Sequence, residues 1–182
     1  MKYLFTFVLL LTLNGCVTET HQEKSTVNLV TTGDINTVIT GRTFFSWHPD
    51  INANYLNKKL NKNDTEEKFI LALKNELKQK GFTYTDDLQK ADFYIGYGLG
   101  VDTKISDDQI LNKTGLSAGI EPHGIDENDS DSDKASVFIA IYLPTQLTPQ
   151  WTILAQGYTD SEQTGAMDEL LQLMFHSLED KN

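Results

Sequence analysis

The sequence is poor in cysteine and in basic residues, and each shortage narrows what the chain can be. Cys16 is the single cysteine among 182 residues, so no disulfide can form within the chain and its core alone must stabilise it. Lys and Arg number 15 against 26 Asp and Glu, which gives a formal net charge of −11. An acidic surface repels phosphate backbones and anionic lipid headgroups, so nucleic-acid binding and membrane attachment through a basic patch are both disfavoured.

The sequence also lacks an apolar run long enough to cross a membrane, although it begins with a short one. After Met1-Lys2, residues 3–13 are apolar except for two threonines. A helix of this length spans about 16 Å, against about 30 Å for the hydrocarbon core of a bilayer. A positive start, an apolar stretch and the small residue Gly15 are typical of a secretory signal peptide, which we expect to comprise residues 1–15.

The end of this segment, Leu13-Asn14-Gly15-Cys16, resembles the lipobox of bacterial lipoproteins, with Asn14 where Ala, Ser or Thr is usual. The resemblance implies lipid transfer to the Cys16 thiol, cleavage before it, and acylation of the new amino terminus, for example by palmitate. Two or more acyl chains anchor a protein stably to a membrane. The residue after the cysteine is Val17 and not an aspartate, which would imply retention in the inner membrane. By the same resemblance, Val17 implies an anchor in the outer membrane that faces the periplasm. The alternative is a free cysteine after an ordinary signal peptide.

After a polar tether at residues 16–26, the pattern predicts one α+β domain over residues 27–182. The clearest helix is expected over 64–80, with Asp64 as its cap and Gly81 as its stop. A second helix is expected over 161–179. Strands are expected where β-branched and aromatic residues concentrate, at 27–30, 37–47, 91–101, 136–143 and 151–158.

The order of these elements predicts a two-layer sandwich, with two helices on a mostly antiparallel sheet of about four to five strands. Pro49 is expected to end the second strand, because proline cannot donate to a ladder. Within 91–101, Gly96, Gly98 and Gly100 share one face. That face would let a helix or a partner backbone approach closely. Their spacing differs from the G-x-G-x-x-G of a dinucleotide loop, so we do not expect nucleotide binding.

A long polar loop with a very acidic end is expected over residues 102–134. Its alternating carboxylates could converge on a calcium ion, with the candidate ligands Asp126, Asp129, Asp131 and Asp133. An EF-hand is rejected, because Lys134 and Ala140 occupy the positions that need Gly and Glu. The alternative, which we favour, is a solvated loop without a metal.

The segment Gly115-Leu116-Ser117-Ala118-Gly119 matches the G-x-S-x-G nucleophile elbow, and Asp168 and His176 follow in hydrolase order. No helix is expected to start promptly after Ser117. Asp168 and His176 stand eight residues apart on one expected helix, about 12 Å of rise, so they could not bond to each other. The four histidines show no metal-ligand spacing. We therefore assign no catalytic residue, cofactor or metal, and keep a serine hydrolase as a weak alternative.

Four short motifs together resemble the bacterial lipoproteins grouped as domain of unknown function 4136. In chain order they are Thr43–Trp47 with His48-Pro49-Asp50, Leu73–Leu77 with Lys80-Gly81-Phe82, Ala91–Tyr97, and Ala155-Gln156-Gly157 with the closing helix. Ala155 departs from the family, where a tryptophan is common, and the acidic loop is longer than usual. The resemblance implies a small envelope lipoprotein without established catalysis, and it supplies no functional residues.

These observations predict a non-enzymatic lipoprotein that is anchored through Cys16 and acts by contacts with an envelope protein partner. A periplasmic module that binds a small ligand or calcium is the alternative reading of the same sequence. The partner, the pathway and the oligomeric state have no signal in the sequence.

Overall fold

The computed structural model describes residues 27–56, 62–101, 111–112, 114–118, 133–159 and 166–180. The expected signal segment (1–15) and the whole expected tether (16–26, with Cys16) therefore lie outside the described residues, as does much of the expected acidic loop. Within the described ranges, no helix combines the length and the apolar character needed to cross a membrane.

One six-stranded sheet organises the domain, in the order β1–β6–β5–β4–β2–β3. Neighbours from β1 to β4 are antiparallel, whereas β4, β2 and β3 run parallel to one another. The mixed α+β class is as expected, but the sheet has more strands and more parallel pairing than the sequence suggested. The strands are β1 (Asn28–Thr32), β2 (Phe44–Leu56), β3 (Thr83–Tyr84), β4 (Phe93–Val101), β5 (Asp133–Tyr142) and β6 (Trp151–Thr159).

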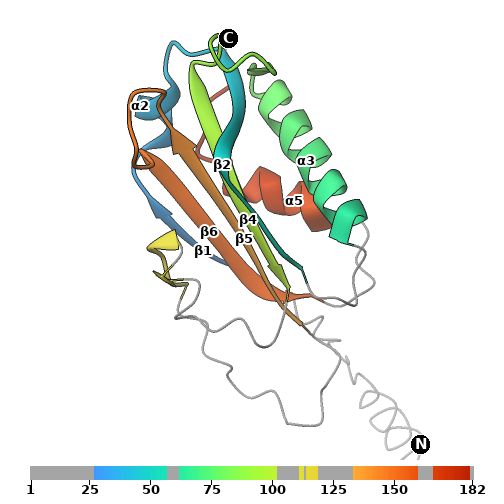
Figure 1. Cartoon of the computed structure of the whole chain (residues 1–182). Helices are drawn as coiled ribbons and strands as arrows, with labels where there is room; N and C mark the ends of the chain where they lie inside the picture. Colours follow the sequence, from blue (N-terminus) through green and yellow to red (C-terminus); the bar gives the residue numbers. More distant parts are fainter. Residues whose placement is uncertain are drawn as a thin grey trace, which may run out of the picture.

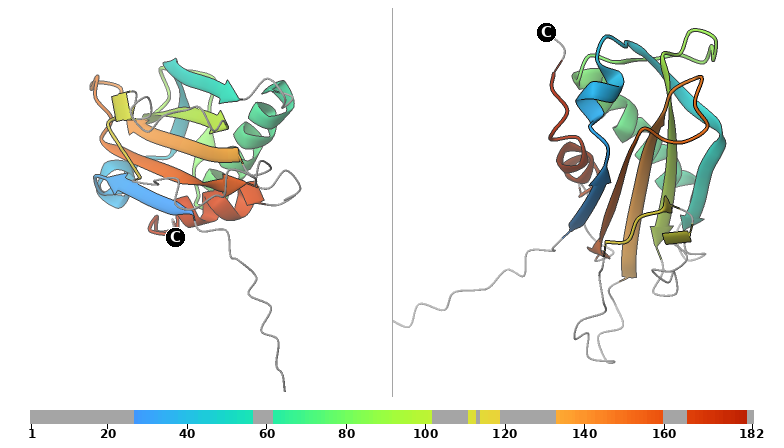
Figure 2. Two further views of the ribbon diagram at one scale, coloured as in Figure 1. Left: turned by 90° about the horizontal axis from the view of Figure 1, so that it is seen from below. Right: turned by 90° about the vertical axis from the view of Figure 1, so that its left-hand side faces the viewer.

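Two helices, α3 (Lys62–Gln79) and α5 (Ala166–Met174), pack on one face of this sheet (Figure 1). A third short helix, α2 (Ile35–Ile39), links β1 to β2 at one end of the sheet (Figure 2). The parallel pairing of β2 with β4 follows from α3, which carries the chain back across the sheet between them, as a crossover connection must.

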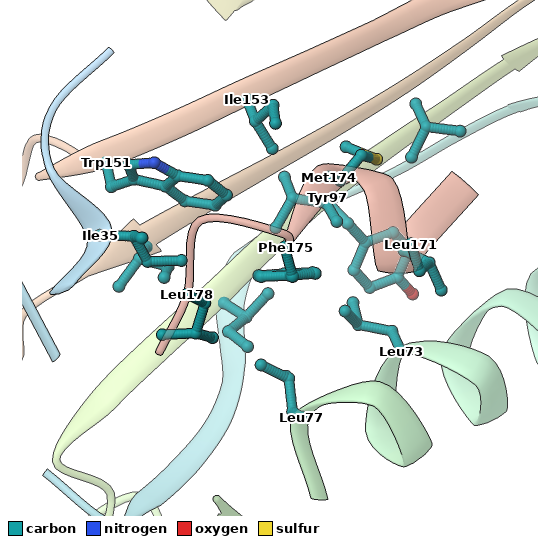
Figure 3. Packing of buried hydrophobic residues seen from close by; sticks show 14 of the residues in the cluster. Ile35, Leu73, Leu77, Tyr97, Trp151, Ile153, Leu171, Met174, Phe175 and Leu178 are labelled. Carbon is teal, nitrogen blue, oxygen red and sulfur yellow. The ribbon is translucent and has the colours of Figure 1, made fainter. Parts of the chain in front are cut away.

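The layer between sheet and helices holds the main core. Trp151 of β6 lies against Phe175, with ring centroids 5.7 Å apart, and Leu73 and Leu77 of α3 complete the contact from the other side (Figure 3). These side chains are almost fully buried. Burial of such large apolar groups is the main force that holds α3 and α5 to the sheet.

The opposite face of the sheet carries a smaller cluster, built from alternate residues of the same strands. Leu116, in the short described segment 114–118, packs there with Phe138 and Tyr142 of β5 and with Leu154 of β6. Both faces of β5 are therefore covered, which accounts for its almost continuous run of apolar residues.

The glycine face of β4 belongs to this second layer, and at Gly96 the close approach is confirmed. A Cβ atom built on Gly96 would lie 2.9 Å from Cγ2 and 3.2 Å from the carbonyl oxygen of Ile51. The group that approaches is thus a neighbouring residue of the sheet rather than a helix or a partner chain.

The expectation that Pro49 ends the second strand is wrong. β2 continues to Leu56, and its pairing with β4 shifts register between Trp47 and Asn52. Proline is tolerated at such a bulge, because the residues there do not form the regular backbone hydrogen bonds between the strands. The irregularity also turns Ile51 toward Gly96, since it changes which side of the strand each residue faces.

Other boundaries differ by a few residues or by one element. Residues 37–39, expected at the start of a strand, belong instead to α2, whose N-cap is Asp34. α3 begins at Lys62, so Asp64 lies in its first turn and pairs with Lys68 at 2.7 Å instead of capping it. α5 ends at Met174, before the expected Glu179, and turns follow it. Gly81 follows the end of α3 and has the left-handed conformation, with φ of 88°, as expected of a residue that stops a helix.

Candidate functional site

Half of the residues nominated for chemistry fall outside the described part of the chain. This holds for the lipidation residue Cys16 and for the calcium candidates Asp126, Asp129 and Asp131. Asp133 is described, and it does not belong to a loop: it opens β5 and pairs in register with Thr159 of β6. The expected loop boundary at residue 134 is therefore wrong by two residues. Among the described residues, no group of three or more His, Cys, Asp and Glu could hold a metal ion.

The residues of the hydrolase alternative lie on opposite faces of the sheet. Leu116, next to Ser117, packs into the cluster on the face without helices. Asp168 is in α5, which covers the other face, and His176 follows α5, with its Nδ1 3.1 Å from the carbonyl oxygen of Leu173. The sheet separates Ser117 from both, so this arrangement does not assemble a Ser–His–Asp triad.

The motifs that carry the family resemblance position strands in this fold. One carboxylate oxygen of Asp92 accepts hydrogen bonds from the backbone N–H groups of Thr43 (2.8 Å) and Phe44 (2.9 Å). This fixes the start of β2 against the start of β4. Next to this contact, Phe45 of β2 stacks on Phe93 of β4, with ring centroids 5.9 Å apart.

Gln156, from the last motif, is a buried polar residue on the face without helices. It is 1% exposed, and its side-chain nitrogen donates to Ser136 Oγ at 3.1 Å. Its side-chain oxygen has no hydrogen-bond partner. A buried unsatisfied amide oxygen costs stability, which is unusual in a native interior.

An aromatic cluster closes the β3 edge of the sheet. The rings of Trp47 and Tyr84 pack together, with centroids 5.8 Å apart. The Lys74 ammonium of α3 lies 3.5 Å from the centroid of the Tyr84 ring. Burial, followed by a hydrogen bond to Asp86, raises the pKa of Tyr84 to about 12. Tyr84 is therefore neutral at physiological pH, and Lys74 binds its ring as a cation–π pair.

Residues of α3 and α5 line a shallow groove of about 210 Å³. Most of its lining side chains are amides and carboxylates. The lining residues are Ala72, Asn75, Glu76 and Gln79 from α3 and Asp168, Leu171 and Gln172 from α5.

Glu76 is the unusual residue of this groove, because it is a carboxylate that is only 7% exposed. In the described part of the chain it makes no hydrogen bond or ion pair through its side chain. Burial raises the pKa of Glu76; Lys80 opposes the shift, whereas Asp180 and Asp168 add to it. The Lys80 ammonium is itself held by Asp180 at 2.9 Å and by the carbonyl oxygen of Leu178 at 3.0 Å.

Sequence reasoning missed Glu76, although a signal was present. Glu76 stands three residues after Leu73 and directly before Leu77, so helical spacing places it at the border of the apolar stripe of α3. A carboxylate at that border must be solvated, paired or buried at a cost. The apolar stripe of α3 does not show which of these three environments Glu76 has, because that depends on where α5 packs.

The comparisons with known proteins show a likeness of fold only. No family model matches the chain, and no curated protein matches its sequence. The chain superposes on PelC from Paraburkholderia phytofirmans, crystallised as a dodecamer, with a TM-score of 0.52 and 10% identity, covering 86% of this chain and 100% of PelC. It superposes equally on a DUF4136 family protein from Bacteroides thetaiotaomicron, with a TM-score of 0.50 and 12% identity over 87% of this chain and all of that one. The chain therefore has the fold of a DUF4136 family protein.

Proposed function

We propose that this protein is a lipoprotein of the domain of unknown function 4136 family, anchored through Cys16 at the periplasmic face of the outer membrane. In this proposal it acts by contacts with other envelope proteins and not by catalysis. The anchor rests on the sequence Leu13–Cys16 and on the apolar segment before it. Membership of the family rests on the four motifs and on the shared fold.

The observation that carries the protein-contact function is the shared fold with PelC, which forms a dodecamer. A domain of this fold can thus present surfaces that bind further subunits. On one side the sheet ends at β1, with five residues. On the other side the two-residue β3 pairs only with Phe44 and Phe45, so among the described residues most of β2 forms the edge. Such an edge presents backbone groups that can pair with another chain.

Photo-crosslinking in intact cells tests this function. A photoreactive residue is introduced singly at exposed positions on three sides of the domain: Thr31 in β1, Leu71 in α3 and Leu147 in the turn between β5 and β6. We expect one position to give a discrete adduct, either with a second copy or with one envelope protein, while the other two do not. Absence of an adduct at all three positions, with the protein present at its native level, would contradict the proposal.

A further inference from the structure

We propose that the groove between α3 and α5 binds the ammonium or guanidinium head of a small cationic group, with Glu76 as its principal anion. This inference goes beyond the function proposed above and does not depend on it. It rests on the burial of Glu76, on the charges around it and on the donors and acceptors that line the groove.

Glu76 has the features of a ligand-binding carboxylate without its ligand. It lies along the groove between two helices, it is more than nine-tenths buried, and its carboxylate is unpaired among the described residues. Among the described residues, the Glu76 oxygens do not belong to the fully buried polar atoms that lack a partner, so they open into the groove where a ligand could reach them. A carboxylate that meets a cation there forms a strong, short hydrogen bond.

The surrounding charges favour a cation. Two anionic groups, Asp180 and Asp168, and one cationic group, Lys80, act on the Glu76 carboxyl group. Lys80 attracts Glu76, but its ammonium is bound by Asp180 and by the Leu178 carbonyl oxygen. Asp168 and Asp180 disfavour the charged form of Glu76, so a bound cation would relieve their repulsion.

The other lining groups select the kind of cation. Asn75, Gln79 and Gln172 offer amide oxygens that can accept several N–H bonds at once. Ammonium and guanidinium groups carry three and five N–H donors, respectively. A bare divalent ion fits less well, because the described residues supply no group of three acidic or histidine ligands. The volume of about 210 Å³ is below the roughly 300–1,000 Å³ of pockets for drug-sized ligands, so it suits a head group.

Such a head could belong to a free amine or to a basic side chain of a peptide. The experiment titrates the purified mature protein with methylguanidinium, with putrescine and with the peptide acetyl-Gly-Arg-Gly-amide, and follows backbone amide NMR shifts. Tetramethylammonium is the matched control, since it has the same unit charge as methylguanidinium but no N–H donor. Calcium and magnesium chloride are titrated as well.

We expect saturable shifts centred on residues 75–79 and 168–172 with at least one N–H-bearing probe and none with tetramethylammonium. Glu76→Gln should weaken the affinity at least about tenfold, a factor that corresponds to about 1.4 kcal/mol. Glu169→Gln removes the same charge from an exposed position of α5 outside the groove lining, and it should change the affinity less than about twofold. Tighter binding of putrescine would assign a free amine, and tighter binding of the peptide would assign a basic side chain.

Several outcomes would overturn the inference. Equal binding of tetramethylammonium, or equal losses in Glu76→Gln and Glu169→Gln, would show that the acidic surface attracts cations without a site. Saturation by calcium or magnesium at lower concentration than by any N–H-bearing probe would assign a metal instead. Absence of shifts with every probe, in a protein whose spectrum shows it folded, would leave Glu76 as a structural carboxylate.

Discussion

At the scale of single residues, Gly96 shows how one missing side chain determines a contact. A Cβ atom there would lie 2.9 Å from Ile51 Cγ2, closer than carbon atoms pack, and the Ile51 carbonyl oxygen is also near. We expect Gly96→Ala to lower the free energy of unfolding by about 1–3 kcal/mol, as overpacking does. Urea denaturation measures this directly.

The matched control is Ile51→Ala, alone and combined with Gly96→Ala. Because shortening Ile51 opens part of the space, the double variant should lose less stability than the two single losses added together. Strictly additive losses, or a Gly96→Ala variant as stable as the parent, would contradict the packing role of Gly96.

Glu76 is the second residue with a measurable consequence. Its folded pKa is raised above the ordinary value of 4.5 by burial, so the folded chain binds this proton more tightly than the unfolded chain. Stability is therefore lost as pH rises from 4.5 through the folded pKa, and it is unaffected by this group below 4.5. Glu76→Gln removes the loss. We expect its stability relative to the parent to increase between pH 4 and pH 7, measured by thermal melts.

The comparison between variants isolates Glu76, since every other carboxylate titrates in both proteins. A difference for Glu76→Gln that stays constant over this pH range would contradict the raised pKa of its carboxyl group.

At the scale of elements, the start of β2 depends on one carboxylate of the β3–β4 connection. Asp92 accepts from two backbone N–H groups, those of Thr43 and Phe44. Hydrogen bonds to charged groups contribute about 1.5–3 kcal/mol. We expect Asp92→Ala to cost at least about 1.5 kcal/mol of unfolding free energy, and Asp92→Asn, which keeps one acceptor oxygen, to cost less. A loss below about 0.5 kcal/mol in Asp92→Ala, the range of ordinary surface changes, would contradict this role.

The elements also show what the sequence could predict. Long periodic segments were readable, because α3, β4, β5 and β6 each bury a continuous stripe or face that their own residues specify. α2 and β3 were missed, because five and two residues are too few for a period to appear. The passage of β2 through Pro49 could not be predicted either, since it depends on a register shift against β4.

The candidate groove was beyond sequence reasoning for a similar reason. Glu76 and Asp168 are more than ninety residues apart in the chain, and only the packing of α3 beside α5 brings them to one groove. The G-x-S-x-G motif shows the converse, because its residues match a reaction pattern while the sheet separates them from Asp168 and His176. Position in the fold, and not residue type, decides both cases.

At the scale of the whole molecule, the register places the start of β1 at the same end of the sheet as the end of β4 and the start of β5. Asn28 lies in register with Gln156, which pairs with Ser136, and Ser136 pairs with Gly100. The acidic connection therefore starts at Val101 and finishes at Asp133 near the start of β1. The acidic character of that connection opposes direct adhesion to anionic lipids.

Membrane attachment should consequently depend on lipid alone. We expect Cys16→Ser to move the protein from the membrane fraction to a soluble or unprocessed form, whereas high salt should leave the parent protein bound. Fractionation with immunodetection measures both. Retention of mature Cys16→Ser protein on membranes would contradict attachment through this cysteine.

The central claim, a lipid-anchored protein that acts through protein contacts, is tested most directly by native mass spectrometry of the protein extracted from its membrane in neutral detergent. One spectrum reports both the covalent lipid and the assembly. The account predicts a chain that begins at Cys16, carries diacylglyceryl and acyl mass, and occurs in a complex with further copies or with one envelope protein. A chain without lipid mass, or a lipidated chain that is monomeric at its native abundance, would contradict it.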